Sequence, residues 1–361
     1  MEKPLKKADT DFTQIIEDCK RQIQEDPSNP EPYNILGTTL ALSGQFEEAL
    51  DVYKKLLNLS PDNTQSLINI GSTLYILGNI DEAIEYYQKA IALEPKNYSA
   101  YMNLANIYAE ENKANIAINY YKEALKLCPD KAELHASLGR TYQDLQKYDK
   151  AIENYKTAIK LEPENYEYYV DIASVYMQNS EFDSAIKYYK EALIRNNKDF
   201  KSLICIGNAL SEQKKFDESF DYYQRSLDIN PDYAKSHLCY GIALSETGKI
   251  DEAIEKYKKA ISLAPEDSKI YIILANTYSE QNQFEEAIKY YKEAIRIDNT
   301  NTMAHMAIGN TLTFMGKYEE AIEHYRTASK LDPNNDEIFT IYAESVEEYT
   351  ALQNENNKEE Q

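Results

Sequence analysis

Residues 64–97 read TQSLINIGSTLYILGNIDEAIEYYQKAIALEPKN, and this 34-residue pattern recurs without insertion or deletion from Pro30 to Asn335. Nine units fill that stretch, at 30–63, 64–97, 98–131, 132–165, 166–199, 200–233, 234–267, 268–301 and 302–335. A fixed period of this length is typical of arrays in which each unit is one small supersecondary element stacked on its neighbours. The sequence therefore predicts a repeat solenoid before any chemistry is considered.

Recurring residue types within the unit predict its internal structure. If the positions are numbered 1 to 34, position 8 is always Gly or Ala, position 24 is always Tyr, and position 20 is Ala in eight units. Positions 4, 7, 8 and 11 share one helical face, as do positions 17, 20, 24 and 27. Each unit is thus predicted to be an antiparallel helical hairpin, which buries a continuous core only when it is stacked on its neighbours.

The same columns, together with Pro at position 32 of seven units, resemble the tetratricopeptide repeat. The resemblance covers the stretch from Pro30 to Asn335. It departs from the family pattern at position 4, where Tyr, Leu or His stands in place of the frequent Trp. The resemblance implies an all-α fold, a right-handed superhelical solenoid of antiparallel helix pairs with capping helices.

The two ends of the chain are expected to differ from the array. Residues 1–29 are expected to hold a tail and a degenerate capping helix over Phe12–Glu25, and residues 336–352 a C-terminal capping helix. The polar residues 353–361 are expected to form a disordered tail. Within the array, Gly at position 15 of four units indicates turns, and Asn or Asp at position 34 of seven units predicts caps for the next first helix.

Charge and composition limit the partners. The formal net charge of −22 argues against nucleic acid and anionic membrane surfaces, because phosphate contacts require a basic protein surface. It favours a protein or peptide partner with basic residues. No apolar stretch approaches the roughly 18 residues of a membrane span, and residues 1–7 lack the apolar core of a secretory signal. We therefore expect no membrane insertion and a location in the cytosol or nucleus.

No pattern indicates catalysis, a metal or a cofactor. All ten glycines occupy packing or turn positions, so none belongs to a phosphate-binding loop. Three histidines share packing position 4 in separate units: His135, His237 and His305. The fourth, His324, has no histidine near it at ligand spacing, so a metal site is not expected. Cys205 and Cys239 share position 6 in adjacent units and are expected to be unbridged thiols, with a ligand or redox role as the alternative.

Positions 2, 6, 9 and 13 lie roughly opposite the packing stripe of each first helix. In the tetratricopeptide family that face lines the concave groove in which extended peptides lie. Position 9 carries side-chain amides that can pair with a peptide backbone, and position 13 carries carboxylates. The candidate contacts are Asn106, Glu110, Asn208, Glu212, Lys235, Glu246, Asn276 and Glu280. The alternative is an ordinary solvated face, since exposed charges are the default.

The resemblance leaves several functions open. A chaperone-tail co-chaperone is not expected, because no lysine occupies position 5, where such family members carry a clamp lysine. The repeat arm of O-linked N-acetylglucosamine transferase has an asparagine ladder at position 6, present here only as Asn69 and Asn103. We do not expect residues 336–361 to form a catalytic domain. We expect a non-catalytic adaptor that binds a partner peptide or helix in its groove. The alternatives are a subunit of a larger multiprotein assembly, of the ciliary-transport or cell-cycle-ligase type, and a substrate-recruiting arm for a transferase.

Overall fold

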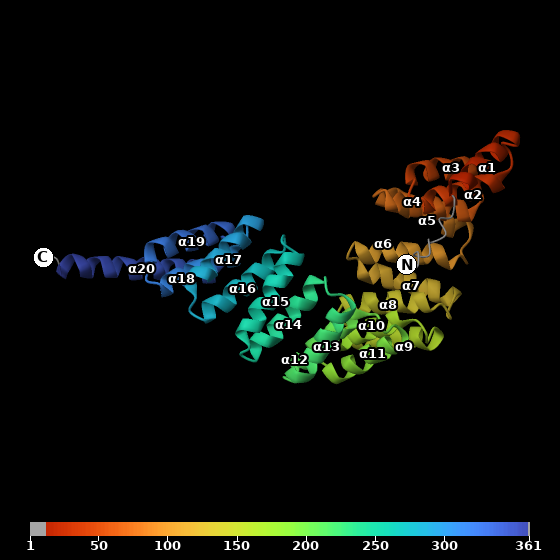
Figure 1. Cartoon of the computed structure of the whole chain (residues 1–361). Helices are drawn as coiled ribbons and strands as arrows, with labels where there is room; N and C mark the ends of the chain where they lie inside the picture. Colours follow the sequence, from red (N-terminus) through yellow and green to blue (C-terminus); the bar gives the residue numbers. More distant parts are fainter. Residues whose placement is uncertain (1–11, 360–361) are drawn as a thin grey trace, which may run out of the picture. The chain divides into compact units, whose positions relative to one another are not determined.

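The computed structural model describes residues 12–359, and the regular elements in that range are α-helices (Figure 1). The chain divides into two compact units, residues 1–179 and 180–361, which are described separately. The first contains α1 (Phe12–Glu25), α2 (Pro30–Leu42), α3 (Phe46–Leu59), α4 (Thr64–Ile76), α5 (Ile80–Leu93), α6 (Tyr98–Glu110), α7 (Ala114–Leu127), α8 (Ala132–Asp144), α9 (Tyr148–Leu161) and α10 (Tyr166–Gln178). The second contains α11 (Phe182–Arg195), α12 (Phe200–Glu212), α13 (Phe216–Ile229), α14 (Ala234–Glu246), α15 (Ile250–Leu263), α16 (Ser268–Glu280), α17 (Phe284–Ile297), α18 (Thr302–Phe314), α19 (Tyr318–Leu331) and α20 (Asp336–Glu359).

Consecutive helices pack as hairpins within each unit, such as α6 with α7 and α12 with α13. In α6, Leu104 and Ala105 are fully buried, and in α7 Ala117 and Tyr121 are buried opposite them. These are members of the two predicted packing stripes, so the predicted helix pairs are confirmed. Burial of these apolar side chains, rather than helix propensity, provides most of the stabilisation of such short helices.

Each predicted turn contains one residue with positive φ, at position 15. Four of these residues are glycines, with φ between 71° and 81°: Gly44, Gly78, Gly248 and Gly316. In the other repeats a similar conformation, with φ between 55° and 60°, is adopted by Asn112, Gln146, Ser180, Lys214 and Asn282. A left-handed conformation costs a residue with a Cβ roughly 1 kcal/mol, so these turns are held by the hairpins around them.

The small residue at position 8 gives the tyrosine at position 24 its place. A Cβ added to Gly37 would lie 2.5 Å from Cε1 of Tyr53, which real side chains do not tolerate without a shift. At Gly139 the corresponding distance to Cε1 of Tyr155 is 3.2 Å. The tyrosine ring therefore packs directly on the helix backbone in the repeats with glycine at position 8, although less tightly in the fourth repeat than in the others.

Several predicted caps at position 34 are present. The side-chain oxygen of Asn63 accepts a hydrogen bond from the backbone N–H of Ser66 at 2.9 Å, and that of Asn301 accepts from Ala304 at 3.0 Å. Asn165 and Asp267 make equivalent bonds at the starts of α10 and α16. Each bond satisfies a backbone donor that the first helical turn leaves without a partner. Asn97 makes no such bond at the start of α6.

The ends carry helices where they were expected. Helix α1 spans Phe12–Glu25 and buries Cys19, while residues 1–11 of the expected tail lie outside the described residues. Helix α20 begins at Asp336 and continues to Glu359, so most of the stretch expected to be a disordered tail is helical. Its position 15 is Thr350, a β-branched residue that does not readily adopt positive φ, and the helix runs on where other first helices end.

Candidate functional site

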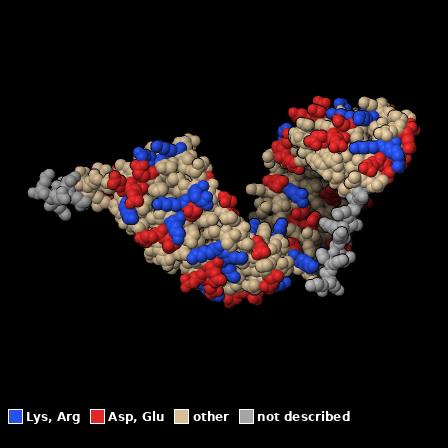
Figure 2. All heavy atoms as spheres, turned by 45° about the horizontal axis from the view of Figure 1, so that its top comes forward, with Lys and Arg blue, Asp and Glu red and all other residues tan. Residues whose placement is uncertain are grey.

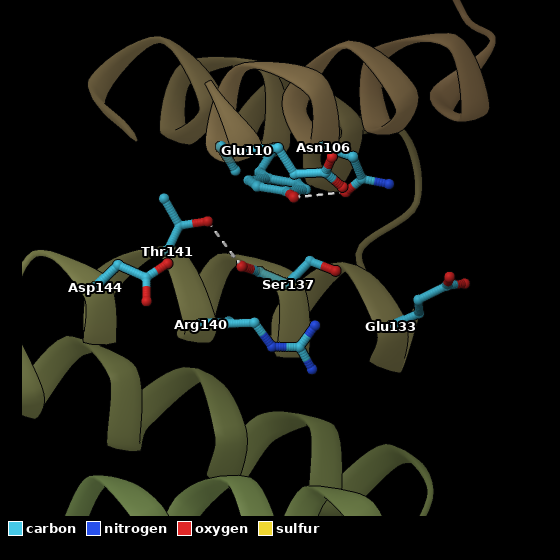
Figure 3. Close-up of a pocket in the computed structure, with 9 residues that line it drawn as sticks. Asn106, Glu110, Glu133, Ser137, Arg140, Thr141 and Asp144 are labelled. Atoms are coloured by element: carbon cyan, nitrogen blue, oxygen red, sulfur yellow. Dashed lines mark hydrogen bonds between the residues drawn. The ribbon is translucent and has the colours of Figure 1, made fainter. Parts of the chain in front are cut away.

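A pocket of about 380 Å³ opens between the first helices of the third and fourth repeats, in the first unit. Its lining comes from α6, α7 and α8: Asn106, Ala109, Glu110, Tyr121, Glu133, Ser137, Arg140, Thr141 and Asp144. In Figure 3 the side chains from α6 and those from α8 face the same space. Most of them occupy positions 2, 6, 9 and 13, so the predicted face does line a shared cavity, and two predicted contacts, Asn106 and Glu110, lie there.

Buried tyrosines orient the polar side chains of this pocket. The hydroxyl of Tyr121 donates to Oδ1 of Asn106 at 2.6 Å. Burial raises the pKa of Tyr121 to about 12, which keeps its hydroxyl protonated and a donor at neutral pH. The hydroxyl of Tyr75, from the preceding repeat, donates to the carboxylate of Glu110. Asn106 is thus held within its own repeat, and Glu110 is tied to the preceding one.

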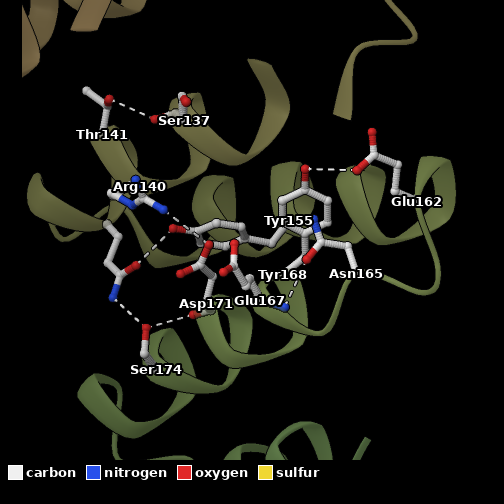
Figure 4. A network of polar contacts seen from close by, with 11 residues as sticks. Ser137, Arg140, Thr141, Tyr155, Glu162, Asn165, Glu167, Tyr168, Asp171 and Ser174 are labelled. Atoms are coloured by element: carbon white, nitrogen blue, oxygen red, sulfur yellow. Dashed lines mark hydrogen bonds and ion pairs between the residues drawn. The ribbon is translucent and has the colours of Figure 1, made fainter. Parts of the chain in front are cut away.

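A second polar network extends from the pocket into α10 (Figure 4). Arg140 lies 3.4 Å from the carboxylate of Asp171, and Tyr155 donates to Gln143 at 3.2 Å. Gln143 in turn donates to Ser174 at 3.0 Å. Burial raises the pKa of Asp171, and Arg140 opposes that rise. Sequence analysis did not single out Arg140, although an arginine in the column that holds four asparagines was a detectable signal.

The other six predicted contacts lie in the second unit and are described there. Two of them repeat the tyrosine bond: Tyr223 donates to Asn208 at 2.8 Å, and Tyr291 donates to Asn276 at 2.6 Å. The charged contacts are all exposed: Glu212, Lys235, Glu246 and Glu280. Glu246 accepts from the turn residue Lys214 at 3.0 Å.

The charges of carboxylates from two neighbouring repeats act on one buried tyrosine in this unit. The pKa of Tyr257 is raised to about 12, mainly by burial and further by the charges of Glu280 and Glu246. Those two glutamates occupy position 13 of adjacent repeats. The charges of two predicted carboxylates therefore act on one buried tyrosine, Tyr257.

The cysteines are free, and burial raises the pKa of both Cys205 and Cys239, which holds them as thiols. The expectation that His324 has no histidine neighbour is wrong. Its Nδ1 lies 3.2 Å from Nδ1 of His305, because positions 4 and 23 face each other across the hairpin. Within the described part of the chain, no three His, Cys, Asp or Glu side chains are grouped to hold a metal ion.

Exposed apolar side chains replace the carboxylates of position 13 near both ends of the array: Leu42, Ile76 and Phe314. Figure 2 shows acidic and basic side chains interspersed over the face of each unit in view. Among the described helices, none combines the length and the hydrophobicity needed to cross a bilayer.

Stacked helical hairpins whose first helices line a polar face define an α-helical repeat scaffold. Family models of the tetratricopeptide repeat match residues 30–63, 64–97, 96–163, 137–200, 198–266, 244–311 and 309–340. The chain belongs to the tetratricopeptide repeat family. Proteins of this family bind peptides or other proteins, and the repeat is in general a non-catalytic interaction scaffold.

A solved structure shares the fold, and two others match with lower TM-scores. A tetratricopeptide repeat protein from Parabacteroides merdae ATCC 43184 is 18% identical, with a TM-score of 0.54 over 69% of this chain and 98% of that chain. MamA is 30% identical, with a TM-score of 0.42 over 46% of this chain and 97% of its own. YrrB, described as a TPR protein with an unusual peptide-binding site, is 22% identical, with a TM-score of 0.42 over 52% and 96%. The comparison with curated proteins finds no match.

Proposed function

We propose that the chain is an adaptor that holds an extended, basic segment of a partner protein along positions 2, 6, 9 and 13 of its first helices. One observation carries the proposal. The tyrosine at position 24 donates to the amide oxygen at position 9 in four repeats, as Tyr121 does to Asn106 and Tyr223 to Asn208. With its oxygen occupied, each asparagine directs its N–H₂ group, a donor, away from the tyrosine.

Donors at the same place in the third, sixth, eighth and ninth repeats suit an extended peptide, whose backbone carbonyls recur at regular intervals along the chain. Each such hydrogen bond contributes only about 1 kcal/mol, so affinity would come from several repeats engaged at once. Because the buried tyrosines fix the amides beforehand, little conformational entropy is lost when they bind.

Charge supports a basic partner. Glu212, Glu246 and Glu280 line one unit, and in the other unit Arg140 is paired with Asp171, beside the carboxylates of the pocket. Opposite charges on a partner would speed association and fix its register, and the effect should weaken with added salt. We place this activity in the cytosol or nucleus, without a cofactor.

The test is an affinity purification of the tagged chain from its own cell extract, followed by identification of the proteins that co-purify. The groove variant changes Glu212, Glu246 and Glu280 to Lys. A matched control makes the same charge change in the same repeats, on exposed glutamates of the second helices: Glu218, Glu252 and Glu286.

The proposal predicts that the groove variant loses one dominant partner while the control retains it, with unchanged helical melting curves for both. A synthetic peptide of the basic segment should then bind the wild-type chain directly. Retention of all partners by the groove variant, or equal losses in both variants, would exclude the groove as the binding site.

A further inference from the structure

Helix α20 exposes three of the positions that most preceding first helices bury, whereas Tyr342 at position 7 is half-buried against the core. If Asp336 is counted as position 1 of a further unit, Phe339, Ala343 and Val346 fall at positions 4, 8 and 11. In α18 the residues at positions 7 and 11, Ile308 and Leu312, are 0% and 4% exposed because α19 covers them. In α20, Phe339 is 59% exposed, Val346 is 36% exposed, and Ala343 is also exposed.

The other side of α20 is packed as in a normal first helix. Its positions 3 and 10, Ile338 and Ser345, are 5% and 7% exposed where α20 lies against α19. The equivalent residues of α18, Ala304 and Thr311, are 0% and 1% exposed. Helix α20 therefore has the preceding neighbour of a first helix and lacks the second helix that would complete the hairpin.

The chain does not supply that second helix within the described residues. Where other first helices turn at position 15 with positive φ, α20 has Thr350 and continues as a helix to Glu359. A terminal cap of a repeat array is expected to turn a polar face to solvent. The outward face of α20 is instead aromatic and aliphatic, with Phe339 and Tyr342 in edge contact at 6.5 Å between ring centroids.

We propose that the open face of α20, formed by Phe339, Tyr342, Ala343 and Val346, docks an amphipathic helix of a partner protein in the place of the missing second helix. The second helices of this chain show what fits. They present Ala or Ser at position 20 and Tyr at position 24, whose ring packs on the small residue at position 8. Ala343 is that small residue in α20, so the partner helix needs an aromatic side chain four residues after a small one.

Charge indicates the chemistry of the partner. The exposed carboxylates of Glu344, Glu347 and Glu348 lie on α20 beside the open face. Two copies of the chain paired through α20 would bring these carboxylates together, and each copy has a net charge of −22. A helix of another protein that carries lysines avoids this repulsion and is attracted instead. The occupant is therefore a basic amphipathic helix rather than a second copy of this chain.

The probe is a synthetic peptide of residues 148–161, YDKAIENYKTAIKL, the sequence of α9. It has the required alanine and tyrosine at Ala151 and Tyr155, and it is more basic than acidic. A covalent staple between the outward positions of Glu153 and Thr157 would keep it helical, because free peptides of this length are marginal helices in water. Fluorescence anisotropy measures its binding to the full chain.

Two variants of the chain carry the same substitution on the same helix. Ala343→Glu places a carboxylate where the tyrosine ring should pack, and Ala351→Glu places it on an exposed site outside the open face. We expect saturable binding to the wild-type chain, about tenfold or more weaker binding to Ala343→Glu, and binding within about twofold of wild type for Ala351→Glu. Both residues are exposed, so both variants should fold, which circular dichroism checks.

Three outcomes would overturn the proposal: the stapled peptide does not bind, it binds wild type and Ala343→Glu equally, or its Tyr155→Ser form binds as well as the parent. Analytical sedimentation tests the alternative that a second copy of this chain occupies the open face. A concentration-dependent dimer that Ala343→Glu dissolves would show that a second copy fills the face. None of these results depends on the groove glutamates, so the proposed groove function is tested separately.

Discussion

The fourth repeat, α8–α9, and the sixth, α12–α13, have the same hairpin structure. Each contains a fully buried tyrosine, but the polar partners of the two tyrosines differ. In the sixth, Tyr223 donates to Asn208 of its own repeat at 2.8 Å. In the fourth, Tyr155 donates to Gln143, which passes the network on to Ser174 of the next repeat. The ring thus maintains the fold, whereas the residues at positions 9 and 12 decide whether the hydrogen-bond network of the tyrosine stays in its repeat or extends to the next one.

The largest expected effect tests the shared part of the comparison. Tyr155 and Tyr223 are 0% and 1% exposed, so replacing either with Ala should destabilise its hairpin by about 3–5 kcal/mol. Hydrogen exchange of α8–α9 and α12–α13 measures the loss locally, which matters because repeat arrays need not unfold in one step. Losses that differ by more than about 2 kcal/mol would show that the polar partners, rather than the ring, dominate.

Replacing the glycine at position 8 with Ala should have a smaller effect on stability, and the effect should differ between the two repeats. A Cβ at Gly207 would lie 2.6 Å from Cε1 of Tyr223, against 3.2 Å at Gly139 and Tyr155. Gly207→Ala should therefore cost about 1–3 kcal/mol through overpacking. Gly139→Ala should be nearly neutral, because the gain of about 1 kcal/mol in helix propensity offsets a mild contact. Thermal or urea unfolding measures both, and the reverse order would mean that the fourth repeat is the tighter one.

The ion pair between Arg140 and Asp171 distinguishes the fourth repeat from the sixth. Arg140→Met leaves the half-buried carboxylate of Asp171 without its cation and should cost about 1 kcal/mol at neutral pH. The folded-state pKa of Asp171 is already above its ordinary value, and loss of Arg140 raises it further. Protonation on acidification then favours the folded variant, so the cost should shrink as the pH falls through that pKa.

The control for this prediction lies in the sixth repeat. Asn208→Ala removes one neutral hydrogen bond, at a similar cost of about 1 kcal/mol. Since no titrating group is lost or left unpaired there, its cost should stay constant over the same pH range. A parallel pH dependence in both variants would rule out Asp171 as the source.

The smallest expected effect is an acid sensitivity of the ninth repeat. There His305 lies beside His324, whereas in the fourth repeat His135 lies beside Asn154. Burial lowers the pKa of His305 and His324 in the folded state. The unfolded chain therefore binds protons first as the pH falls below about 6.5, and α18–α19 should lose stability there. His324→Asn should reduce this acid sensitivity, measured by hydrogen exchange between pH 7 and about pH 5. An unchanged sensitivity would contradict this assignment.

Much of the fold follows from the sequence because the same residue types recur at the same positions of each repeat. A tyrosine at position 24 and a small residue at position 8 in every unit leave little freedom for the hairpin. The helix caps were predictable for the same reason. The turns were predictable only in part, since Lys214 and Gln146 adopt positive φ that their side chains disfavour. There the packing of the hairpin overrides the local preference.

The candidate site was less predictable. Helical spacing predicts that Asn106 and Glu110 share one face, and both line one pocket, but spacing says nothing about contacts across a hairpin or between repeats. The His305–His324 contact joins positions 4 and 23, and the Arg140–Asp171 pair joins neighbouring repeats. Both contacts depend on how the helices pack in three dimensions, which the spacing of residues along the sequence does not reveal.

The turns at position 15 have a further consequence for how the array could be tuned. Five of them hold a residue with a Cβ in a conformation that glycine adopts freely. Changing one such residue to Gly should relieve strain at a single hairpin, by up to about 1 kcal/mol, and leave the others as they are. Evolution or an engineer can therefore decide, one turn at a time, which segment of the array opens first under stress.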